Sequence, residues 1–512
     1  MATDATETQP QRVNGRLGSK KTKNGCFTCR KHRVKCDESR PQCKRCTRLK
    51  LHCAGYQDVF RDVNVSRKRS ATPAHNPSQS AANPERPLGT FHGSDDECRL
   101  FEYFRKRVAF QLGGFLDEDF WITTLLQASH STSFIRHSAI AIAAYIGERN
   151  GHFRATTPRQ SCNVALNYYQ NALCRASQRT ESADPELVAI LTCPLFLCME
   201  FLQGKKLQAM SLFLHGHFLM ESCQGWTRRH SALSEWATIN ESLRPMYNRL
   251  VMMAKLFGHN LPIYYANLPF PPSPNPTLST FNSLKDARDL LFQHLVVTHE
   301  FVKSLNSTTA RPISTHKHYL QRQEELRIQL DIWYSDFHRM CGSLDDPDHA
   351  VIATLSMWHA AAVIWLRNPL EGFEMSFDES LDCFQVIVEK ADEALATKRQ
   401  IHDAFTFEMG VLPPLYFTAL KCRHFSLRKE ALRLMGKGPR REGLWDREEL
   451  LTVASQAFAL ETAAQSDITS LPSEPERLLR VRIFQQDAGH ELKAAFIYRD
   501  GQVERVWNQI IQ

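Results

Sequence analysis

The chain has 512 residues, 43% hydrophobic and 23% charged, which allows two or more domains and excludes a largely disordered protein. The formal net charge is +8, yet residues 11–56 carry 14 Lys and Arg against two acidic residues, a net charge of +12, so the remainder carries about −4. This asymmetry predicts a small head that binds a polyanion, joined to a large and nearly neutral body.

The N-terminal residues 1–19 are polar and contain no apolar segment of the kind found in secretory signal peptides. Apolar runs such as Ala360–Leu366 are far shorter than the ~18 residues of a membrane-spanning helix. We therefore expect a disordered N-terminus and a soluble intracellular protein that does not bind membranes. Intracellular thiols stay reduced, so a cluster of cysteines here indicates metal binding before disulfides.

Six cysteines follow within 28 residues, in two copies of the pattern C-x2-C-x6-C: Cys26, Cys29, Cys36, Cys43, Cys46 and Cys53. A closed structural zinc site needs four ligands, so two ions need eight thiolate bonds from six thiolates. Two sulfurs must then bridge both ions. The internal duplication makes the first cysteine of each copy, Cys26 and Cys43, the natural bridging pair.

This segment resembles the fungal zinc binuclear cluster family of transcription factors. The matching residues are Gly25, Cys26, Cys29, Arg30, Val34, Lys35, Cys36, Asp37, Glu38, Pro41, Cys43, Cys46 and Cys53. The resemblance implies two Zn²⁺ ions in a small domain over residues 20–56. It assigns one ion to Cys26, Cys29, Cys36 and Cys43, and the other to Cys26, Cys43, Cys46 and Cys53.

Basic residues fill the first gap between cysteines, and the resemblance implies that a short helix after Cys29 enters the DNA major groove. Arg33 stands at the main base-reading position, where it can pair with guanine through two hydrogen bonds. The other predicted contacts are Arg30, Lys31, His32 and Lys35, of which Arg30, Lys31 and Lys35 are expected to touch phosphates. His32 either reads a base or is a surface side chain without a specific contact. Val34 is expected to pack against the metal core.

Other interpretations of the cysteine segment remain open. The metal could serve only to fold a segment too short for its own core, but that does not explain the surplus of positive charge. Some basic residues could neutralise the thiolates. A disulfide knot conflicts with the missing secretion signal, and RNA binding conflicts with the lack of aromatic residues between the outer cysteines, where Phe27 stands alone.

Residues 57–93 are rich in Pro, Ser, Ala and Asn in their second half, which predicts a disordered linker. Within it, Arg67, Lys68 and Arg69 could form a nuclear import signal, together with the basic run at Lys20–Lys23. They could equally be solvated linker charge or additional phosphate contacts. No sustained heptad repeat follows the cysteines, so the oligomeric state stays open between a monomer and a dimer formed through the body.

Residues 94–512 are expected to form an all-α body. Ser94 and Glu97 make a capping box before a helix that ends at Gly113, and Gly204 separates two long apolar helices that predict an αα-hairpin. Further helices are expected to begin at Pro158 and at Pro185 and to span Ser283–Leu305, His318–Met340, His349–Arg367, Leu381–Thr397 and Glu448–Gln465. A small β-hairpin is expected around Val481–Phe484 and Ala494–Tyr498.

The body resembles, more loosely, the α-helical fungus-specific transcription factor domain that accompanies this cluster. Motifs of metalloproteases, nucleotide-binding loops and serine hydrolases are missing, so we expect no enzyme activity. His215 and His217 are interpreted as structural, and Cys193 and Cys198 as core residues. The predicted function is a nuclear regulator of transcription that binds double-stranded DNA, with a body that binds co-regulators or a small effector. The alternative is a metabolite-sensing or enzyme-like body fused to a zinc head.

Overall fold

The computed structural model describes part of the cysteine segment and most of the chain after it. The described residues are 28–29, 34, 36–37, 39, 43–49, 53, 93–114, 116–117, 119–152, 158–177, 185–222, 234–257, 281–306, 313–367, 373–396, 404–463, 470–485, 492–500 and 503–511. The chain divides into two compact units, residues 1–86 and 87–512. The predicted N-terminal region 1–19, the basic run Arg67–Arg69 and all of the predicted linker 57–93 except Gly93 lie outside the described residues.

The first unit has a core of sulfur. Helix α2 spans Lys44–Arg48 and begins directly after Cys43. Five buried cysteines pack together, and partly buried Val34 lies against them, as the sequence predicted. Cys29 is helical, but the residues that would continue the predicted helix lie outside the described part of the chain.

The second unit begins with the helix predicted after Ser94. It runs through three consecutive elements, α3 (Asp95–Tyr103), the π-helical η1 (Phe104–Val108) and α4 (Ala109–Gly113). The Ser94 hydroxyl accepts a hydrogen bond from the Glu97 backbone N–H, and the Glu97 carboxylate accepts one from the Ser94 N–H. Gly114 ends the helix with a φ of 55°, a conformation that glycine adopts readily. The predicted helix and its capping box are confirmed.

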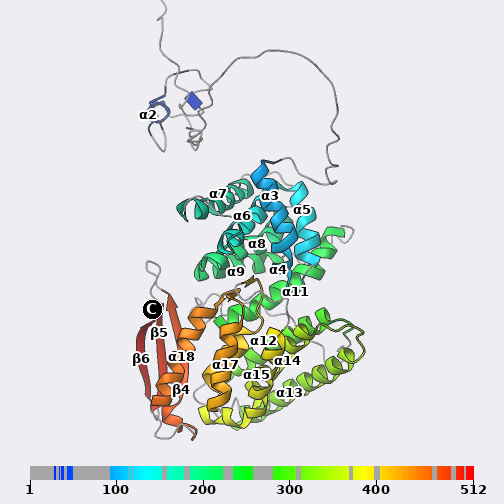
Figure 1. Ribbon diagram of the computed structural model, residues 1–512, viewed down its shortest axis with the longest axis vertical. Helices are drawn as coiled ribbons and strands as arrows, with labels where there is room; N and C mark the ends of the chain where they lie inside the picture. The colour runs from blue at the N-terminus through cyan, green and yellow to red at the C-terminus, as the bar shows by residue number, and fades with distance from the viewer. Residues whose placement is uncertain are drawn as a thin grey trace, which may run out of the picture. The chain divides into compact units, whose positions relative to one another are not determined.

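Two groups of helices build the body (Figure 1). After α4, the first group contains η2 (Asp119–Thr124), α5 (Leu125–Ser131), α6 (Ser133–Arg149), α7 (Pro158–Ser177), α8 (Pro185–Gln203) and α9 (Lys206–Ser222). The second group contains α12 (Leu284–Asn306), α13 (Ile313–Cys341), α14 (His349–Arg367), η4 (Glu374–Ser380), α15 (Leu381–Ala396), α16 (Leu412–Lys421), α17 (Phe425–Lys437) and α18 (Arg447–Ala463). Helix α11 (Ser234–Phe257) packs against both α9 and α12 and so joins the groups.

The predicted helices are present, and most of their limits agree within a few residues. The largest difference is in α13, which begins at Ile313 rather than at the predicted His318. Helix α6 was not predicted, although it lies at the centre of the first group. Most of its residues are buried, so it lacks the polar face that reveals a helix in a sequence.

Helices α8 and α9 form the predicted αα-hairpin, with Gly204 between them at a φ of 71°. Pro194 lies inside α8, as expected. A second glycine, Gly216 on α9, permits a close approach, because a Cβ there would lie 2.4 Å from Cys193 Sγ and 2.7 Å from the Tyr247 hydroxyl. The hairpin is therefore packed tightly against α11 at this point.

Helix α14 (His349–Arg367) is a long and strongly apolar helix of the body. Its 19 residues have a mean hydropathy of 1.5 over the most apolar stretch, long and apolar enough for a membrane span, but 72% of that stretch is buried inside the body. Trp358 is 1% exposed, and its Nε1 donates to Gly410 O over 3.0 Å. The apolar character of α14 is thus that of a core helix.

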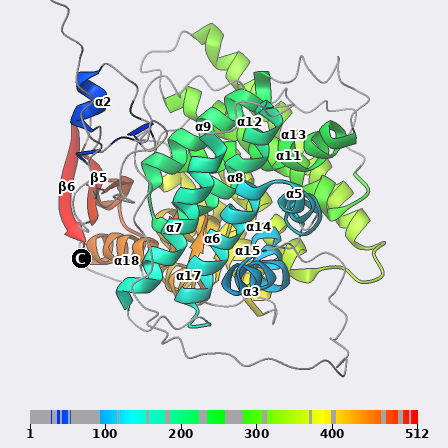
Figure 2. The ribbon, with the colours of Figure 1, turned by 90° about the horizontal axis from the view of Figure 1, so that it is seen from above.

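The predicted C-terminal hairpin is one part of a three-stranded antiparallel sheet. Its strands are β4 (Leu478–Gln485), β5 (Leu492–Asp500) and β6 (Val503–Ile511), in the order β4-β5-β6. Figure 2 shows β5 beside α18, and buried Phe496 of β5 packs against Val453 and Ala457 of that helix. Strand β6 was missed because its apolar residues face solvent; Trp507, for example, is 57% exposed. A second small sheet contains β1 (Phe405–Thr406), β2 (Arg441–Glu442) and β3 (Trp445–Asp446).

Candidate metal centre and nucleic-acid interface

Two groups of cysteine sulfurs share Cys43. One contains Cys29, Cys36 and Cys43, the other contains Cys43, Cys46 and Cys53, and within each group the sulfurs lie within 4.8 Å of one another. Four sulfurs about 2.3 Å from a tetrahedral zinc lie roughly 3.8 Å apart. The sulfurs of Cys29 and Cys43 are 3.7 Å apart, which fits two ligands of one ion. A thiolate common to both groups is the arrangement that a bridging ligand requires.

The five described cysteines form no disulfide with another described residue and are at most 8% exposed. Exclusion of water and a set of soft sulfur ligands suit a structural zinc site. The two groups pack against each other, since Cys29 Sγ also lies 3.9 Å from Cys46 Sγ. The sixth cysteine, Cys26, lies outside the described residues, so each group shows three of the four ligands that an ion needs.

Helix α2 is held at its first turn by the metal ligands themselves. The Cys43 sulfur accepts a hydrogen bond from the Cys46 N–H over 3.3 Å, so the C-x2-C spacing caps the helix as well as pairing two sulfurs. Asp37 accepts from the N–H groups of Lys44 and Arg45 over 3.0 and 3.3 Å. A hydrogen bond from the Ser39 hydroxyl, followed by these backbone donors, holds the pKa of Asp37 well below its usual range. Asp37 is therefore charged at the positive end of α2.

Next to the buried sulfurs the unit presents positive charge. Lys44, Arg45 and Arg48 line a hollow of about 310 Å³ together with Cys36 and Asp37. Lys44 and Arg48 are exposed. Exposed cations beside a rigid metal core are suited to contacts with phosphates, which position a protein on DNA without reading its sequence.

The residues predicted to contact DNA, Arg30, Lys31, His32, Arg33 and Lys35, lie outside the described residues. Their positions relative to the sulfurs therefore rest on the sequence alone. The described part adds Lys44, Arg45 and Arg48 of α2, which were not among the predicted DNA contacts. Their placement on α2 follows from the second C-x2-C pair.

The body buries a cluster of charges between its two helix groups. Arg249 of α11 pairs with Asp117, Asp289 and Glu408, and Arg288 of α12 also pairs with Asp117 at 2.8 Å. Burial raises the pKa of Glu408 to about 7 although Arg249 opposes the shift. Burial also disfavours ionised Asp117, but Arg249 and Arg288 hold the pKa of Asp117 below its usual range. No local sequence pattern indicates this cluster, because Arg249 and Asp117 are 132 residues apart.

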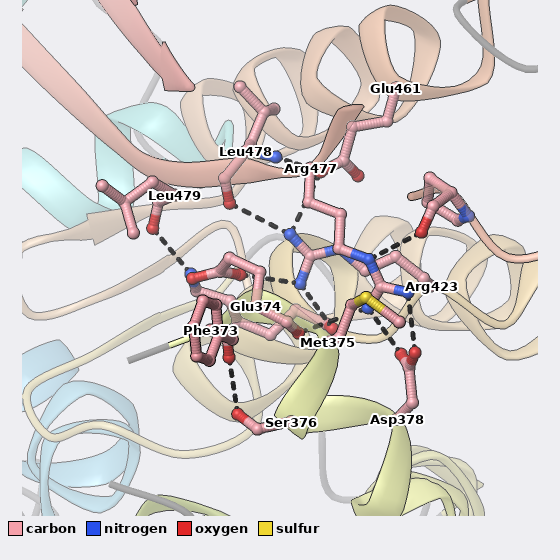
Figure 3. A network of polar contacts seen from close by, with 12 residues as sticks. Phe373, Glu374, Met375, Ser376, Asp378, Arg423, Glu461, Arg477, Leu478 and Leu479 are labelled. Atoms are coloured by element: carbon pink, nitrogen blue, oxygen red, sulfur yellow. Dashed lines mark hydrogen bonds and ion pairs between the residues drawn. The ribbon is translucent and has the colours of Figure 1, made fainter. Parts of the chain in front are cut away.

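A second buried cluster attaches the C-terminal sheet to the helices (Figure 3). Arg477 holds Asp378 through two hydrogen bonds of 2.7 Å. Glu461 of α18 pairs with Arg423 and Arg428 and accepts a 2.6 Å hydrogen bond from the N–H of Leu478, the first residue of β4. Every ion in this group faces an opposite charge, which is the pattern of a structural network rather than of a catalytic site with a group free to act.

A third buried carboxylate, Glu442 of β2, caps helix α16. It accepts hydrogen bonds of 2.7, 3.0 and 3.0 Å from the backbone N–H groups of Gly410, Val411 and Leu412. Burial raises the pKa of Glu442 to about 7, although these backbone donors oppose the shift. Glu442 therefore becomes charged close to neutral pH.

Histidine and cysteine residues of the body fit the structural roles predicted for them. His217 is buried against Phe213, whereas His215 faces solvent, with its Nδ1 2.7 Å from Ser211 O. Within the described part of the chain, groups of three possible metal ligands occur only among the N-terminal cysteines. Burial raises the pKa of Cys193 to about 12 and that of Cys198 well above its ordinary value, so both are unreactive thiols in the core.

Comparison with known proteins agrees with this geometry. Residues 24–62 match the family model of the fungal Zn(2)-Cys(6) binuclear cluster domain. The chain is 22% identical to the aspercryptin biosynthesis cluster-specific transcription regulator of Emericella nidulans, over 96% of each protein. No solved structure matches the chain.

Two further relatives match over shorter regions. White-opaque regulator 2 of Candida albicans is 52% identical over 57 residues, which cover 11% of this chain and 13% of the relative. The Zn(2)-C6 fungal-type transcription factor afumD of Aspergillus fumigatus is 28% identical over 34% of this chain and 46% of its own. Residues 24–62 are therefore a Zn(2)-Cys(6) binuclear cluster domain that binds two zinc ions, in a chain that is similar to fungal transcription regulators.

Proposed function

We propose that this protein is a nuclear, sequence-specific transcription regulator whose two-zinc cluster reads a G-containing site in the DNA major groove. The observation that carries the proposal is the shared position of Cys43 in two sulfur groups, with the basic residues of α2 next to it. A sulfur core rigid enough to present a short helix, surrounded by a surplus of positive charge, is suited to DNA.

In this proposal, Cys26 and Cys43 bridge the two ions. One ion is completed by Cys29 and Cys36, and the other by Cys46 and Cys53. Each described group of three sulfurs is the expected set of four ligands without Cys26, which supports the assignment.

Arg33 reads guanine through its planar guanidinium, and Arg30, Lys31 and Lys35 contact phosphates on either side of it. His32 lies next to the base-reading residue. The support for these roles is the position of each residue after Cys29 in the matched domain. Lys44 and Arg48 add phosphate contacts from α2.

The helical body, residues 94–512, has a regulatory role and binds co-regulators or a small effector. Its buried arginines each face a carboxylate, which supports regulation rather than catalysis. The relative that covers 96% of the chain is named as the regulator of a biosynthesis cluster, so we also propose biosynthetic genes as targets. The linker 57–93 joins the two domains, and Arg67, Lys68 and Arg69 serve nuclear import.

Selection of duplexes from a random pool by the full-length, zinc-loaded protein tests the proposal. We expect enrichment of a short G-containing site and its loss when zinc is removed by a chelator. A pool without an enriched site, or equal retention of single-stranded RNA, contradicts sequence-specific DNA binding.

A further inference from the structure

A small hollow of about 80 Å³ lies within the helical body where α4, α6 and α8 of the first helix group meet the β1–β3 sheet. One water needs about 10–15 Å³ on the same measure, so the hollow has room for several waters or for one oxyanion. Its polar lining comes from α4, the end of α6 and β2: Gln111, Arg149, Asn150, Arg440 and Arg441.

The charges around this hollow are unbalanced. Arg441 pairs with Asp446 at 2.6 Å, but Arg149 and Arg440 have no carboxylate partner within the described part of the chain. The ends of α6 and α8 also point here, and each helix C-terminus carries about half a negative charge. The three guanidinium groups carry three positive charges, while the carboxylate and the two helix C-termini together carry about two negative charges. The net charge around the hollow is therefore roughly +1.

The guanidinium of Arg441 also has a donor to spare. Its Nη1 is buried and makes no hydrogen bond to any described residue. The joint between α8 and α9 holds this side chain in place, since a Cβ on Gly204 would lie 3.6 Å from Arg441 Nη2. A buried donor without an acceptor costs about 1–3 kcal/mol, and a bound oxyanion removes that cost.

The other lining groups are fixed by contacts with the backbone. Gln111 Nε2 donates to Phe405 O over 2.7 Å, and Arg149 Nη1 reaches Leu202 O at 3.4 Å. Arg440 is exposed and also lines the hollow. The site thus combines two positioned groups with one exposed cation.

We propose that this hollow binds the phosphate or carboxylate group of a small anionic metabolite. Arg441 and Arg149 hold the oxyanion, Arg440 closes over it, and the remainder of the ligand extends into solvent. Because the lining comes from the first helix group and from the β1–β3 sheet, the ligand joins these two parts of the body. A role for this ligand in controlling DNA binding rests on the proposed function, whereas the binding itself does not.

Calorimetric titration of the full-length, zinc-loaded protein tests the site, with inorganic phosphate in one experiment and malonate in another. We expect saturable binding that Arg440→Gln and Arg149→Gln each weaken about tenfold, since each removes a charge-assisted contact. Asp446→Asn removes the competing carboxylate from Arg441, so it should tighten binding. Tighter binding of phosphate assigns a phosphorylated ligand, and tighter binding of malonate assigns a carboxylate.

The matched control is Arg433→Gln, which removes an exposed arginine of α17 that pairs with Glu430 away from the hollow. It should bind both anions as the unmodified protein does. Residues 1–86 are the same in all variants, so any phosphate held by the basic head cancels in the comparison. The titration contains no DNA, so a failure of the proposed DNA binding would leave its result unchanged. The proposal is overturned if neither anion saturates the protein, or if Arg440→Gln binds both anions unchanged.

Discussion

The cysteine unit and the helical body depend on different interactions. In the described part of the cysteine unit, the core consists of five cysteines with only Val34 packed against them. The body instead buries a large apolar core in which Trp121, Trp333 and Trp358 are at most 1% exposed. Burial of apolar surface stabilises a domain by about 25 cal/mol per Å², so the body has a source of stability that the cysteine unit lacks.

Folding of the cysteine unit therefore depends on metal, whereas folding of the body depends on its apolar core. In the cysteine unit, charged and sulfur-containing side chains replace the core, and zinc supplies the folding free energy. In the body, the buried arginines are paired with carboxylates of other elements, on top of an apolar core that stabilises the fold. Removal of one of these interactions at a time should change the stability or the DNA binding of one unit and leave the other unit unchanged.

Removal of zinc should have the largest effect. Structural zinc contributes an apparent free energy of about 10–16 kcal/mol to small zinc domains, so a chelator should unfold the cysteine unit and abolish DNA binding. Elemental analysis of the untreated full chain should give about two zinc ions per chain. The thermal transition of the body, followed by far-UV circular dichroism, should not change. A shift of that transition on chelation would show that the two units do not differ as described.

Two single substitutions separate the shared ligand from an unshared one. Cys43 belongs to both sulfur groups, whereas Cys53 belongs to one. Cys43→Ser should therefore lose most of both ions, and Cys53→Ser should retain about one ion because the first set of four ligands is intact. Cys174→Ser, at an exposed cysteine of the body, is the control. Equal zinc contents in the Cys43 and Cys53 variants would exclude a bridging role for Cys43.

Loss of one buried carboxylate should weaken only the body. Glu461→Gln leaves Arg423 and Arg428 without their shared counter-charge, and breaking such a buried pair costs about 3–5 kcal/mol. Urea unfolding should show this loss, with zinc content unchanged. Glu430→Gln, which breaks an exposed pair on α17, is the matched control and should change stability little. Similar unfolding midpoints for the two variants would mean that the Glu461 cluster does not hold the sheet to the helices.

Features formed by residues that are close together in the sequence could be predicted from it. The spacing from Cys26 to Cys53 predicted the metal centre because all its ligands lie in one short segment. The Ser94–Glu97 capping box and the Gly204 joint were likewise visible, since each is a contact between near neighbours. The placement of Cys43 in two sulfur groups agrees with the bridging role inferred from the duplicated pattern.

Features that depend on distant partners could not be predicted. Helix α6 is surrounded by other helices, so its apolar residues show no period, and β6 exposes the apolar residues that a strand usually buries. Arg249 and Glu461 form ion pairs with residues that are far away in the sequence. The residues next to them in the sequence do not indicate that either side chain is buried. The same holds for Arg441, whose neighbours in the hollow come from four other elements.

The pH dependence of the body's stability should reveal its unusual carboxylates. The pKa of Glu442 is raised from 4.5 to about 7, so the folded body binds more protons than the unfolded chain between these values. Stability from this group is then fully present below about pH 4.5 and lost as the pH rises through 7, by roughly 3 kcal/mol. Glu442→Gln keeps an oxygen that accepts the α16 donors but cannot ionise. The difference in unfolding free energy between the two proteins should vary with pH in that window, and a constant difference would contradict the raised pKa.

The smallest expected effect concerns the proposed DNA contacts Arg33 and Lys31, neither of which is a zinc ligand. Arg33→Ala should cost about 1–3 kcal/mol on a duplex that contains the preferred guanine and relax the choice of that base, because two hydrogen bonds to its edge are lost. Lys31→Ala should weaken binding to all duplexes alike and make the salt dependence shallower by about one unit, because one phosphate contact is lost. Binding of both variants to matched and mismatched duplexes should be measured at several salt concentrations.

Zinc content and the unfolding of the body should be the same in both variants, so that a loss of affinity reports a lost DNA contact rather than a loss of folding. If Arg33→Ala lowers every affinity equally and keeps the base preference, Arg33 contacts the backbone, and the base-reading residue must be sought at His32 or on α2 after Cys46.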